Sequence, residues 1–302
     1  YSLFTGLIYF AQEPWHLCVV RFIAALGMGG EWSLGIALVM EVWPEKHRPL
    51  MAGIIGAAAN VGFALIAVFA IFFKVTIDSW RWVALIGAAP ALLTFGFRLF
   101  VPESEKWQAA VKASPTKIRP LQEIFGPQLW RTTLIATALT SVALIGTWGS
   151  VQWLPLWADK MAGAADPSAK GWTGLASGFG AVVGCLAGAW IGGFVRRRTM
   201  FFLLCLGSLV TCAILFRGFD SYGPAFLTMV FVVGALTASF YGFFPLYLPE
   251  LFPTRVRATG QGLSYNAGRI LAAAGALEMS ALMGMFDGSY AKAGAIITLV
   301  YL

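Results

Sequence analysis

Glu41-Val42-Trp43-Pro44-Glu45-Lys46-His47-Arg48 is the stretch that decides the fold, because its pattern occurs a second time in the chain. The second copy runs from Glu250-Leu251-Phe252-Pro253 to Arg257, so that both read Glu-x-x-Pro-x-x-x-Arg. The two copies are 209 residues apart, and Gly53 matches Gly262 at the same offset. Each copy lies between long apolar runs. A polar loop repeated in the same order between apolar segments indicates two halves related by a parallel repeat.

The composition indicates a membrane protein. Hydrophobic residues make up 59% of the 302 residues and charged residues only 12%, which is more apolar surface than a soluble domain can bury. Five stretches contain no charge at all: 49–73, 132–158, 171–195, 199–216 and 221–249. Each is long enough to cross a bilayer as a helix, and none alternates with the period of a strand. We therefore predict an all-α polytopic membrane helix bundle.

Ten apolar segments follow one another along the chain. They are 1–11, 17–41, 50–73, 81–100, 131–157, 172–195, 199–216, 223–248, 259–283 and 290–302. Applying the repeat offset predicts that roughly 80 residues, with two spans and part of a third, precede Tyr1, and that the last span continues beyond Leu302. We therefore expect the complete protein to have twelve spans, six in each half, and this chain to be a fragment of it.

The two halves and their linker can be given boundaries. We predict an N-terminal half at 1–101, a linker with four prolines at 102–130 and a C-terminal half at 131–302. Of the 21 lysines and arginines, 13 lie in segments on one side of the membrane and 6 on the other, and the richer side contains the linker. Cytoplasmic loops are enriched in these residues. We therefore predict an inner-membrane protein with a cytoplasmic linker, in which the net charge of +7 reflects topology rather than nucleic-acid binding.

No pattern in the sequence indicates an enzyme, a cofactor or a metal site. The four cysteines lie inside apolar runs without the spacing of metal ligands, and His16 and His47 lie at the ends of apolar runs. Neither a nucleophile–base arrangement nor a phosphate-binding loop is present. We expect the partners to be a small-molecule substrate, protons and the lipid bilayer, and we expect a monomer.

The stretch from Arg21 to Gly53 resembles the fourth span and following loop of the major facilitator superfamily. It is most similar to the carboxylate and metabolite proton symporters of the sialate and lactate type, through Arg21-Phe22, Gly27-Met28-Gly29-Gly30-Glu31-Trp32, Glu41, Pro44-Glu45-Lys46 and Arg48. Two further stretches resemble the family. Trp80-Arg81-Trp82 and Val101-Pro102-Glu103-Ser104 resemble its sixth span and the exit from that span, and residues 248–260 resemble its loop between spans ten and eleven. The resemblance implies two six-helix halves and proton-coupled symport.

Two places depart from the family pattern. Members usually carry glycine where this chain has Ala25. The loop between spans eight and nine keeps Gly188, Arg197 and Arg198, but glycine and valine replace its usual Asp, Arg and Gly at positions 192, 193 and 195. The acidic part of that motif is therefore missing from this half.

Glu31 and Arg21 are the candidates for proton coupling. Glu31 lies ten residues from Glu41, which is about 15 Å along a helix and near the middle of the membrane. A carboxylate at this depth either faces a cavity, where it can carry a proton, or anchors a neighbouring helix. The glycines at 27, 29 and 30 would let such a neighbour approach closely. The resemblance implies a coupling role for Arg21, while its place one turn inside the span also fits snorkelling to the interface.

Arg269 is the candidate for binding the substrate. It lies twelve residues beyond Arg257, about 18 Å into its span. Its guanidinium could hold a substrate carboxylate through two hydrogen bonds or pair with an acid on another helix, such as Glu31. The repeat offset pairs Arg269 with Asn60. We assign the following further polar groups within spans to the substrate site: Gln152, Tyr241, Tyr265 and Asn266.

The repeated loops are candidates for a gate on the cytoplasmic side. We expect a network of ion pairs among Glu41, Arg48, Glu250, Arg257, Arg197 and Arg198. Ion pairs that form in one conformation and break in the other can bias a two-state transporter. The alternative is a cluster of charges that only sets the topology.

The leading functional hypothesis is a secondary transporter that works by alternating access and moves a small organic anion with protons. A porter of sugars or other neutral metabolites is the alternative within transport, because Val101-Pro102-Glu103-Ser104 is equally common there. A membrane sensor that transports nothing is the alternative outside transport. It would predict a large soluble domain attached to the spans.

Overall fold

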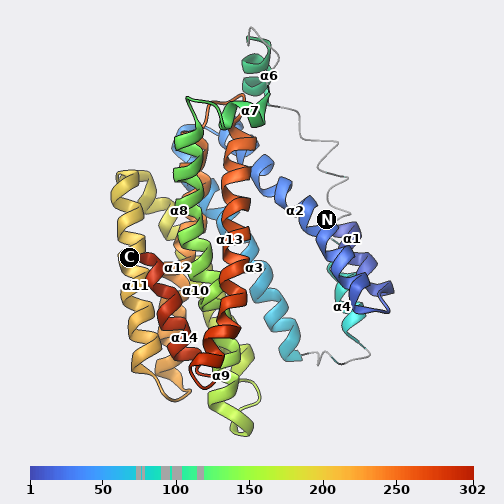
Figure 1. Cartoon of the computed structure of the whole chain (residues 1–302), viewed down its shortest axis with the longest axis vertical. Helices are drawn as coiled ribbons and strands as arrows, with labels where there is room; N and C mark the ends of the chain where they lie inside the picture. The colour runs from blue at the N-terminus through green and yellow to red at the C-terminus, as the bar shows by residue number, and fades with distance from the viewer. Residues whose placement is uncertain (73–75, 77–78, 90–95, 97–103, 114–118) are drawn as a thin grey trace.

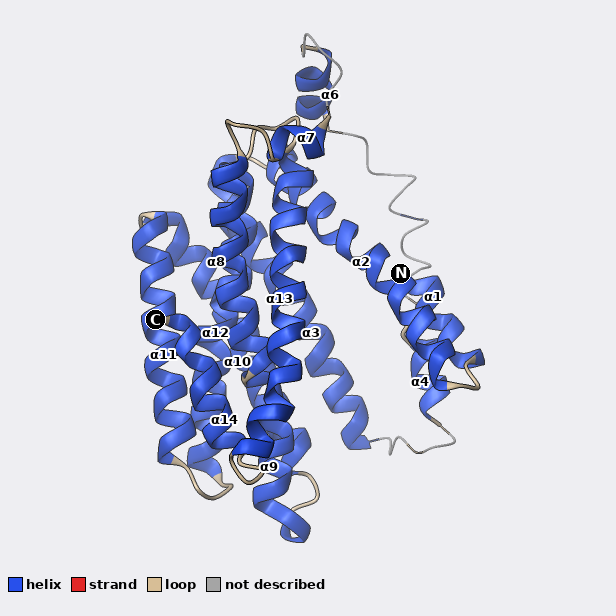
Figure 2. Cartoon of the chain, in the orientation of Figure 1, coloured by secondary structure: helices blue, strands red, loops and turns tan. Residues whose placement is uncertain are grey.

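The computed structural model describes residues 1–302 except 73–75, 77–78, 90–95, 97–103 and 114–118 (Figure 1). The described residues form helices and connecting segments and contain no strand (Figure 2). This confirms the prediction of an all-α fold. Half of the predicted sixth span, 81–100, lies outside the described residues, and so do Val101, Pro102 and Glu103.

The first half and the linker contain eight of the described helical segments. They are α1 (Ser2–Leu7), the 3₁₀ helix η1 (Ile8–Phe10), α2 (Pro14–Val42), the 3₁₀ helix η2 (Glu45–His47), α3 (Arg48–Phe72), α4 (Trp80–Ile86), α6 (Glu105–Lys112) and α7 (Pro120–Ile124). Helix α2 begins with a proline at its first position, where no N–H is needed, and with a capping box between Glu13 and His16. It ends at Val42 because Pro44 forces Trp43 into an extended conformation.

The second half contains the remaining described helices. They are α8 (Trp130–Gly149), η3 (Val151–Trp153), α9 (Leu154–Ala162), η4 (Gly163–Ala165), α10 (Ala169–Phe194), α11 (Arg197–Gly218), α12 (Pro224–Leu251), α13 (Arg257–Met285), α14 (Tyr290–Ile297) and η5 (Thr298–Tyr301). The predicted span 131–157 is interrupted after Gly149. Ser150 leaves the α-helical conformation, and Pro155 cannot donate a backbone hydrogen bond.

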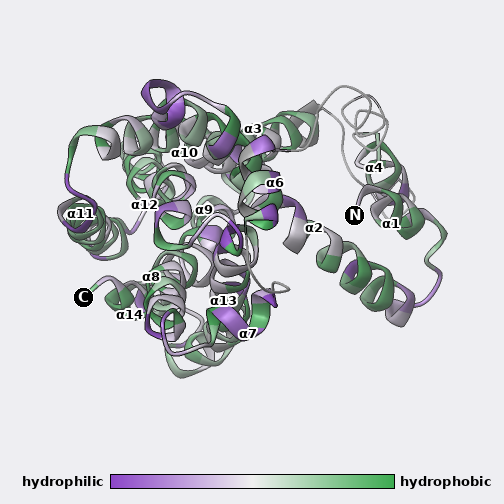
Figure 3. Ribbon diagram, turned by 90° about the horizontal axis from the view of Figure 1, so that it is seen from above, coloured by the Kyte–Doolittle hydropathy of each residue, from purple (hydrophilic) through white to green (hydrophobic). Residues whose placement is uncertain are grey.

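The helices have the surface expected of membrane spans. By length and composition, six described stretches can cross a membrane: Pro14–Val42, Glu45–Ile66, Trp130–Ala165, Ala169–Phe194, Arg197–Gly218 and Pro224–Leu251. On α11, the buried side chains include Cys212 and Leu215, while Leu203, Val210 and Ile214 are exposed. Figure 3 shows that the helices consist largely of hydrophobic residues on all sides, whereas hydrophilic residues gather in the connecting segments. Helices that are apolar on both faces belong in lipid.

Helices α10 and α12 form the tightest pair in the second half. A Cβ atom at Gly184 would overlap the carbonyl of Ala235, and one at Gly242 would overlap the carbonyl of Cys185. Without these side chains the two backbones approach closely enough for the Ser239 hydroxyl to donate to the Gly184 carbonyl at 2.9 Å. Packing through small residues is the usual way for helices to associate in a membrane.

Helices α2 and α3 of the first half meet α10, α12 and α13 of the second. Helix α3 packs on α10 and α12, and α2 packs on α13. A Cβ at Gly56 of α3 would lie 2.7 Å from the backbone nitrogen of Gly242, so these helices also touch through their backbones. In Figure 1, α2 meets α13 near α7 and leans away from it towards the opposite end of the bundle. Helices α2 and α13 therefore join the halves near the end that carries the linker helices, whereas the contact between α3 and α10 extends from Gly53 to Ala64.

Candidate functional site

At the linker end, the two repeated loops are joined by an ion pair. Arg257 Nη1 donates to Glu41 Oε1 at 3.2 Å, across the boundary between the halves. The other carboxylate oxygen, Oε2, accepts a hydrogen bond of 2.5 Å from the hydroxyl of Ser104. Glu41 and Ser104 are both only 5% exposed. One buried carboxylate therefore joins the first half, the second half and the linker.

Local sequence explains where Arg257 is held. Pro253 has no N–H, so the carbonyl of Pro249, four residues earlier, lacks its usual helical donor. Arg257 Nε takes that place and donates to the Pro249 carbonyl at 2.9 Å. The guanidinium is thereby fixed at the end of α12 while its Nη1 reaches Glu41.

Of the other predicted gate residues, Arg197, Glu250 and Arg48 form ion pairs within one half, and Arg198 forms none with the residues that the structure describes. Arg197 Nε and Nη2 donate to the two carboxylate oxygens of Glu250 at 2.9 and 2.7 Å. Arg48 Nη1 binds Glu45 at 3.2 Å, and its Nε is buried without a partner among the described residues. The pair between Arg48 and Glu250, which the repeat would make equivalent to Arg257 and Glu41, is not formed in this conformation.

The linker makes a second contact with the second half through α7. Arg255 Nε donates to Glu123 Oε1 at 2.7 Å, and this hydrogen bond raises the pKa of Arg255 above its ordinary value. Nearby, the hydroxyl of Thr133 donates to the carbonyl of Ile124 at 2.8 Å. The end of α7 is therefore tied to α8 and to the loop before α13.

Two amide side chains of α13 bind the backbone of α2. Gln261 is fully buried, and its Nε2 donates to the carbonyl of Ser33 at 2.6 Å. Asn266 Nδ2 donates to the carbonyl of Gly29 at 3.0 Å. A Cβ at Gly29 would lie 3.3 Å from Asn266 Oδ1, and one at Gly262 would lie 2.7 Å from the Ser33 hydroxyl. The approach is close because these positions are small.

Between the Gln261 and Asn266 amides, a pair of aromatic rings also joins α2 to α13. The rings of Trp32 and Tyr265 stack with centroids 3.9 Å apart and planes inclined by 16°. The guanidinium carbon of Arg269 lies 4.9 Å from the centroid of Tyr265, and Arg269 Nη1 donates to Asn266 Oδ1 at 3.4 Å. Arg269, Tyr265 and Asn266, three of the predicted substrate residues, are thus brought together.

The other predicted substrate residues lie in different surroundings. The buried hydroxyl of Tyr241 has no hydrogen-bond partner among the residues that the structure describes. Asn60 Nδ2 donates to the carbonyl of Gly56 at 3.3 Å and to Cys185 Sγ at 3.5 Å, so it lies where α3 crosses α10. Gln152 is exposed in η3.

The two candidates for proton coupling lie on α2 with exposed side chains. Neither Glu31 nor Arg21 makes an ion pair or a side-chain hydrogen bond with any residue that the structure describes. Of the glycines beside Glu31, Gly29 makes the predicted close contact with another span, whereas Gly30 has nothing within 4 Å of its would-be Cβ.

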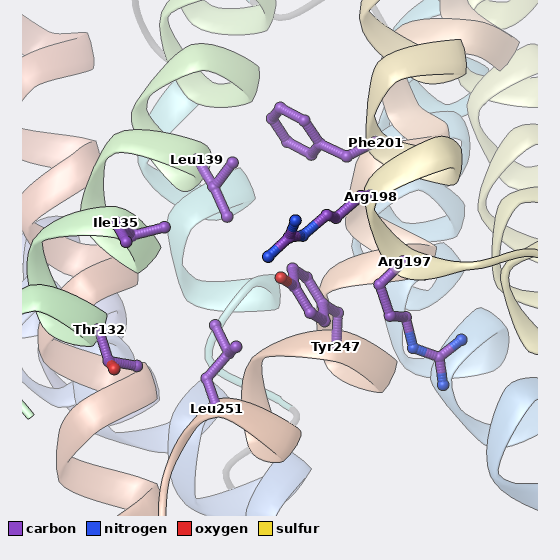
Figure 4. A pocket seen from close by; sticks show the side chains of 8 residues that line it. All are labelled: Thr132, Ile135, Leu139, Arg197, Arg198, Phe201, Tyr247 and Leu251. Carbon is purple, nitrogen blue, oxygen red and sulfur yellow. The ribbon is translucent and has the colours of Figure 1, made fainter.

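A pocket of about 350 Å³ lies at the linker end of the second half (Figure 4). Its lining comes from α8, α11 and α12: Thr132, Ile135, Leu139, Arg197, Arg198, Phe201, Tyr247 and Leu251. The guanidinium of Arg198 points to the hydroxyl of Tyr247, while Arg197 points away from both. No lining residue comes from the first half, and a path between two halves needs walls from both. We therefore do not place the transport site here.

Sequence reasoning missed three contributors to these contacts. Ser104 caps α6 by accepting from the backbone of Trp107 at 3.2 Å, and a serine three residues before that tryptophan is the signal that could have shown it. Ser33 and Trp32 belong to an apolar run in which nothing marks the side that meets α13. Gln261 could be recognised as a polar residue within a span, but not as one that binds the other half.

Comparison with known proteins identifies relatives over the whole chain. The model of the Major Facilitator Superfamily matches residues 1–276. A Haemophilus influenzae protein provisionally described as a metabolite transport protein is 29% identical over 100% of this chain and 74% of its own length. The cis,cis-muconate transport protein of Acinetobacter baylyi is 26% identical over 90% of this chain and 67% of its own length. The sialic acid transporter NanX of Escherichia coli is 26% identical over 96% and 69%.

A solved structure has the same fold. The human organic anion transporter MFSD10 (TETRAN) superposes with a TM-score of 0.68 over 99% of this chain and 72% of its own, at 15% sequence identity. At this identity the similarity concerns the fold alone. The chain spans between two thirds and three quarters of the length of these four proteins.

Proposed function

The chain belongs to the Major Facilitator Superfamily, and from that premise we propose that its protein moves a small organic anion across the membrane together with protons. It is a multi-pass membrane chain of a transporter family, and we propose transport rather than an enzymatic role for it. Proton coupling, the anionic substrate and a monomeric state are the proposed refinements.

The environment of Arg269 is the observation that carries the proposal. Arg269 lies within the membrane-spanning part of α13. In the described part of the chain, its guanidinium contacts the neutral groups of Asn266 and Tyr265. A cation within a span is costly unless an anion or a polar cavity compensates it. A substrate carboxylate would do so through paired hydrogen bonds. Muconate and sialic acid, named for two relatives, are both carboxylates.

We propose Glu31 as the proton carrier, with Arg21 in a supporting role. Glu31 is halfway along α2, a few residues from the Gly29 carbonyl and Trp32 that touch α13. A carboxylate at this depth favours its protonated form whenever it is removed from water. Its charge can therefore change if the movement of the two halves carries it into and out of contact with water.

The ion pairs at the linker end would form the gate. Glu41 pairs with Arg257 across the halves, and Glu250 pairs with Arg197 beside it. With the linker in the cytoplasm, as the distribution of lysine and arginine predicts, this conformation is closed on the cytoplasmic side. Arg48 and Arg198 lie at the same end and are free to exchange partners when the halves rock.

Uptake into proteoliposomes tests the proposal. The full-length protein would receive an inward acid gradient and labelled muconate, sialic acid or glucose, as wild type, Glu31→Gln and Arg269→Ala. We expect the gradient to drive carboxylate uptake, Glu31→Gln to uncouple uptake from pH, and Arg269→Ala to weaken binding at least tenfold, about 1.4 kcal/mol or more. Uptake of glucose alone, or carboxylate uptake that ignores pH and Glu31, would contradict the proton–anion mechanism.

A further inference from the structure

One face of α13 carries both the anion site and the contact with α2. Counting from the linker end, it presents Gln261, then Tyr265 and Asn266, then Arg269. The first three touch α2 through an amide bond to Ser33, a ring stack and an amide bond to Gly29. Arg269 follows one turn later. An anion bound there would lie one turn from the contact that closes the halves.

Arg269 is held by the same two residues that hold α2. Its Nη1 donates to Asn266 Oδ1 at 3.4 Å, and its guanidinium lies 4.9 Å from the centre of the Tyr265 ring. The opposite end of the same amide donates to Gly29, and the same ring stacks on Trp32. A change in the partners of Arg269 therefore alters the contacts of α2 with the Asn266 amide and the Tyr265 ring.

Hydrogen-bond cooperativity predicts whether binding at Arg269 strengthens or weakens the contact with α2. A cation that binds the oxygen of an amide polarises it and makes its N–H a stronger donor, so Arg269 strengthens the bond from Asn266 to Gly29. A carboxylate is a stronger acceptor for a guanidinium than an amide oxygen is. An anion that binds Arg269 would take it from Asn266 and weaken the cation–π contact with Tyr265.

We propose that Asn266 and Tyr265 are positioning residues that make anion binding loosen the contact between α2 and α13. This inference rests on the proposed anion site at Arg269. Binding from one side of the membrane then favours opening on the other, since the weakened contact lies between Arg269 and the linker end. A ligand can shift a conformational equilibrium only by such a difference in its interactions with the two states.

Gln261 provides a matched control. It makes the same kind of bond as Asn266, from a side-chain amide to a backbone carbonyl of α2, at 2.6 Å. No contact joins it to Arg269 among the described residues. Gln261→Leu should loosen the closed state without affecting its response to an anion, whereas Asn266→Leu should remove the response itself.

The experiment measures the separation of the linker ends of the two halves. Spin labels on Lys46→Cys and Thr199→Cys, both exposed, would be introduced into the full-length protein with Cys18→Ser, because Cys18 is the exposed cysteine while the other three are buried. Distance distributions by double electron–electron resonance would be compared without ligand and with saturating cis,cis-muconate. Muconate binding and uptake would be measured in parallel on each variant.

We expect muconate to increase the separated population of the wild type at least threefold. Gln261→Leu should begin with a larger separated population and keep the threefold increase. Asn266→Leu should also begin higher but show no increase when muconate is bound. Tyr265→Phe, which keeps the ring, should respond like the wild type, and Tyr265→Leu should respond less.

Two results would overturn the inference while leaving the transport proposal intact. One is a wild type that takes up muconate without any change in the separated population. The other is an equal increase in Asn266→Leu and Gln261→Leu, which would make Asn266 a merely structural contact. If the wild type neither binds nor takes up muconate or sialic acid, the anion function fails, and this inference fails with it.

Discussion

At the scale of single residues, Glu41 stands out because each of its carboxylate oxygens has a different task. Oε1 binds Arg257 of the other half, and Oε2 binds Ser104 at the start of the linker helix α6. A buried carboxylate that loses one of its two partners keeps its desolvation penalty. The strength of the pair between the halves therefore depends on a hydroxyl outside both loops.

Ser104→Ala tests this dependence. Losing the hydroxyl should destabilise the conformation closed at the linker end by about 1–2 kcal/mol, because Glu41 Oε2 would be left without a donor. We expect the KM for uptake from the outside to rise by up to roughly fivefold to thirtyfold, since a smaller fraction of the protein would be competent to bind. Ser104→Thr keeps the hydroxyl and should resemble the wild type. An unchanged KM in Ser104→Ala would mean that the linker does not support the gate.

The shape of the Arg269 side chain leads to a second prediction at this scale. A guanidinium can donate two parallel hydrogen bonds to a carboxylate, whereas the ammonium of a lysine acts as a point charge. We expect Arg269→Lys to keep carboxylate selectivity but to weaken binding by roughly tenfold. Competition with unlabelled carboxylates would measure the affinity. Equal affinities of Arg269→Lys and the wild type would exclude a paired contact.

At the scale of helices, the rigidity of the second half depends on the glycines between α10 and α12. Gly184 faces the backbone of Ala235 so closely that any side chain would have to push the helices apart. Gly207 of α11 is a suitable control, because its would-be Cβ meets only the side chain of Leu236, at an ordinary distance of 3.5 Å.

Gly184→Ala should destabilise the fold by about 1–3 kcal/mol or more, as overpacking does elsewhere. The expected result is a lower melting temperature of the detergent-solubilised protein and a smaller monodisperse fraction. Gly207→Ala should leave both unchanged or raise them slightly, because alanine is the better helix former. A Gly184→Ala protein as stable as the wild type would show that the helices separate at little cost.

The helices show how far the sequence alone could be interpreted. Charge-free runs and proline positions predicted most spans, because lipid excludes charges and proline ends helices locally. The break after Gly149 was missed, since apolar composition is the same on both sides of it. The repeat predicted Glu41, Glu250 and Arg257 as gate residues. It did not predict that Glu250 would bind Arg197 rather than Arg48. That choice depends on how far α11 lies from α12, which no local pattern records.

At the scale of the whole molecule, the two halves carry the same loop pattern, but the two loops do not make the same contacts. Arg257 binds both the Pro249 carbonyl and Glu41, whereas the Nε of the equivalent Arg48 is buried and finds no partner in the part of the chain that the structure describes. One of two equivalent bridges between the halves is therefore made. An arrangement in which one bridge is closed and its counterpart open can rearrange without breaking every contact at once, which suits a protein that must rock between two states.

Rocking requires the linker ends of α3 and α10 to separate, and a covalent link between them should stop it. A Cβ at Gly53 would lie 3.2 Å from the Cβ of Ala189, close to the separation that a disulfide needs. In the full-length protein without its native cysteines, Gly53→Cys with Ala189→Cys should lose uptake by at least tenfold on oxidation and recover it on reduction. Each single variant should be indifferent to oxidant. Because the link joins the halves at the closed end only, continued uptake by the oxidised protein would mean that the substrate passes without these helices moving apart, and alternating access about this interface would be wrong.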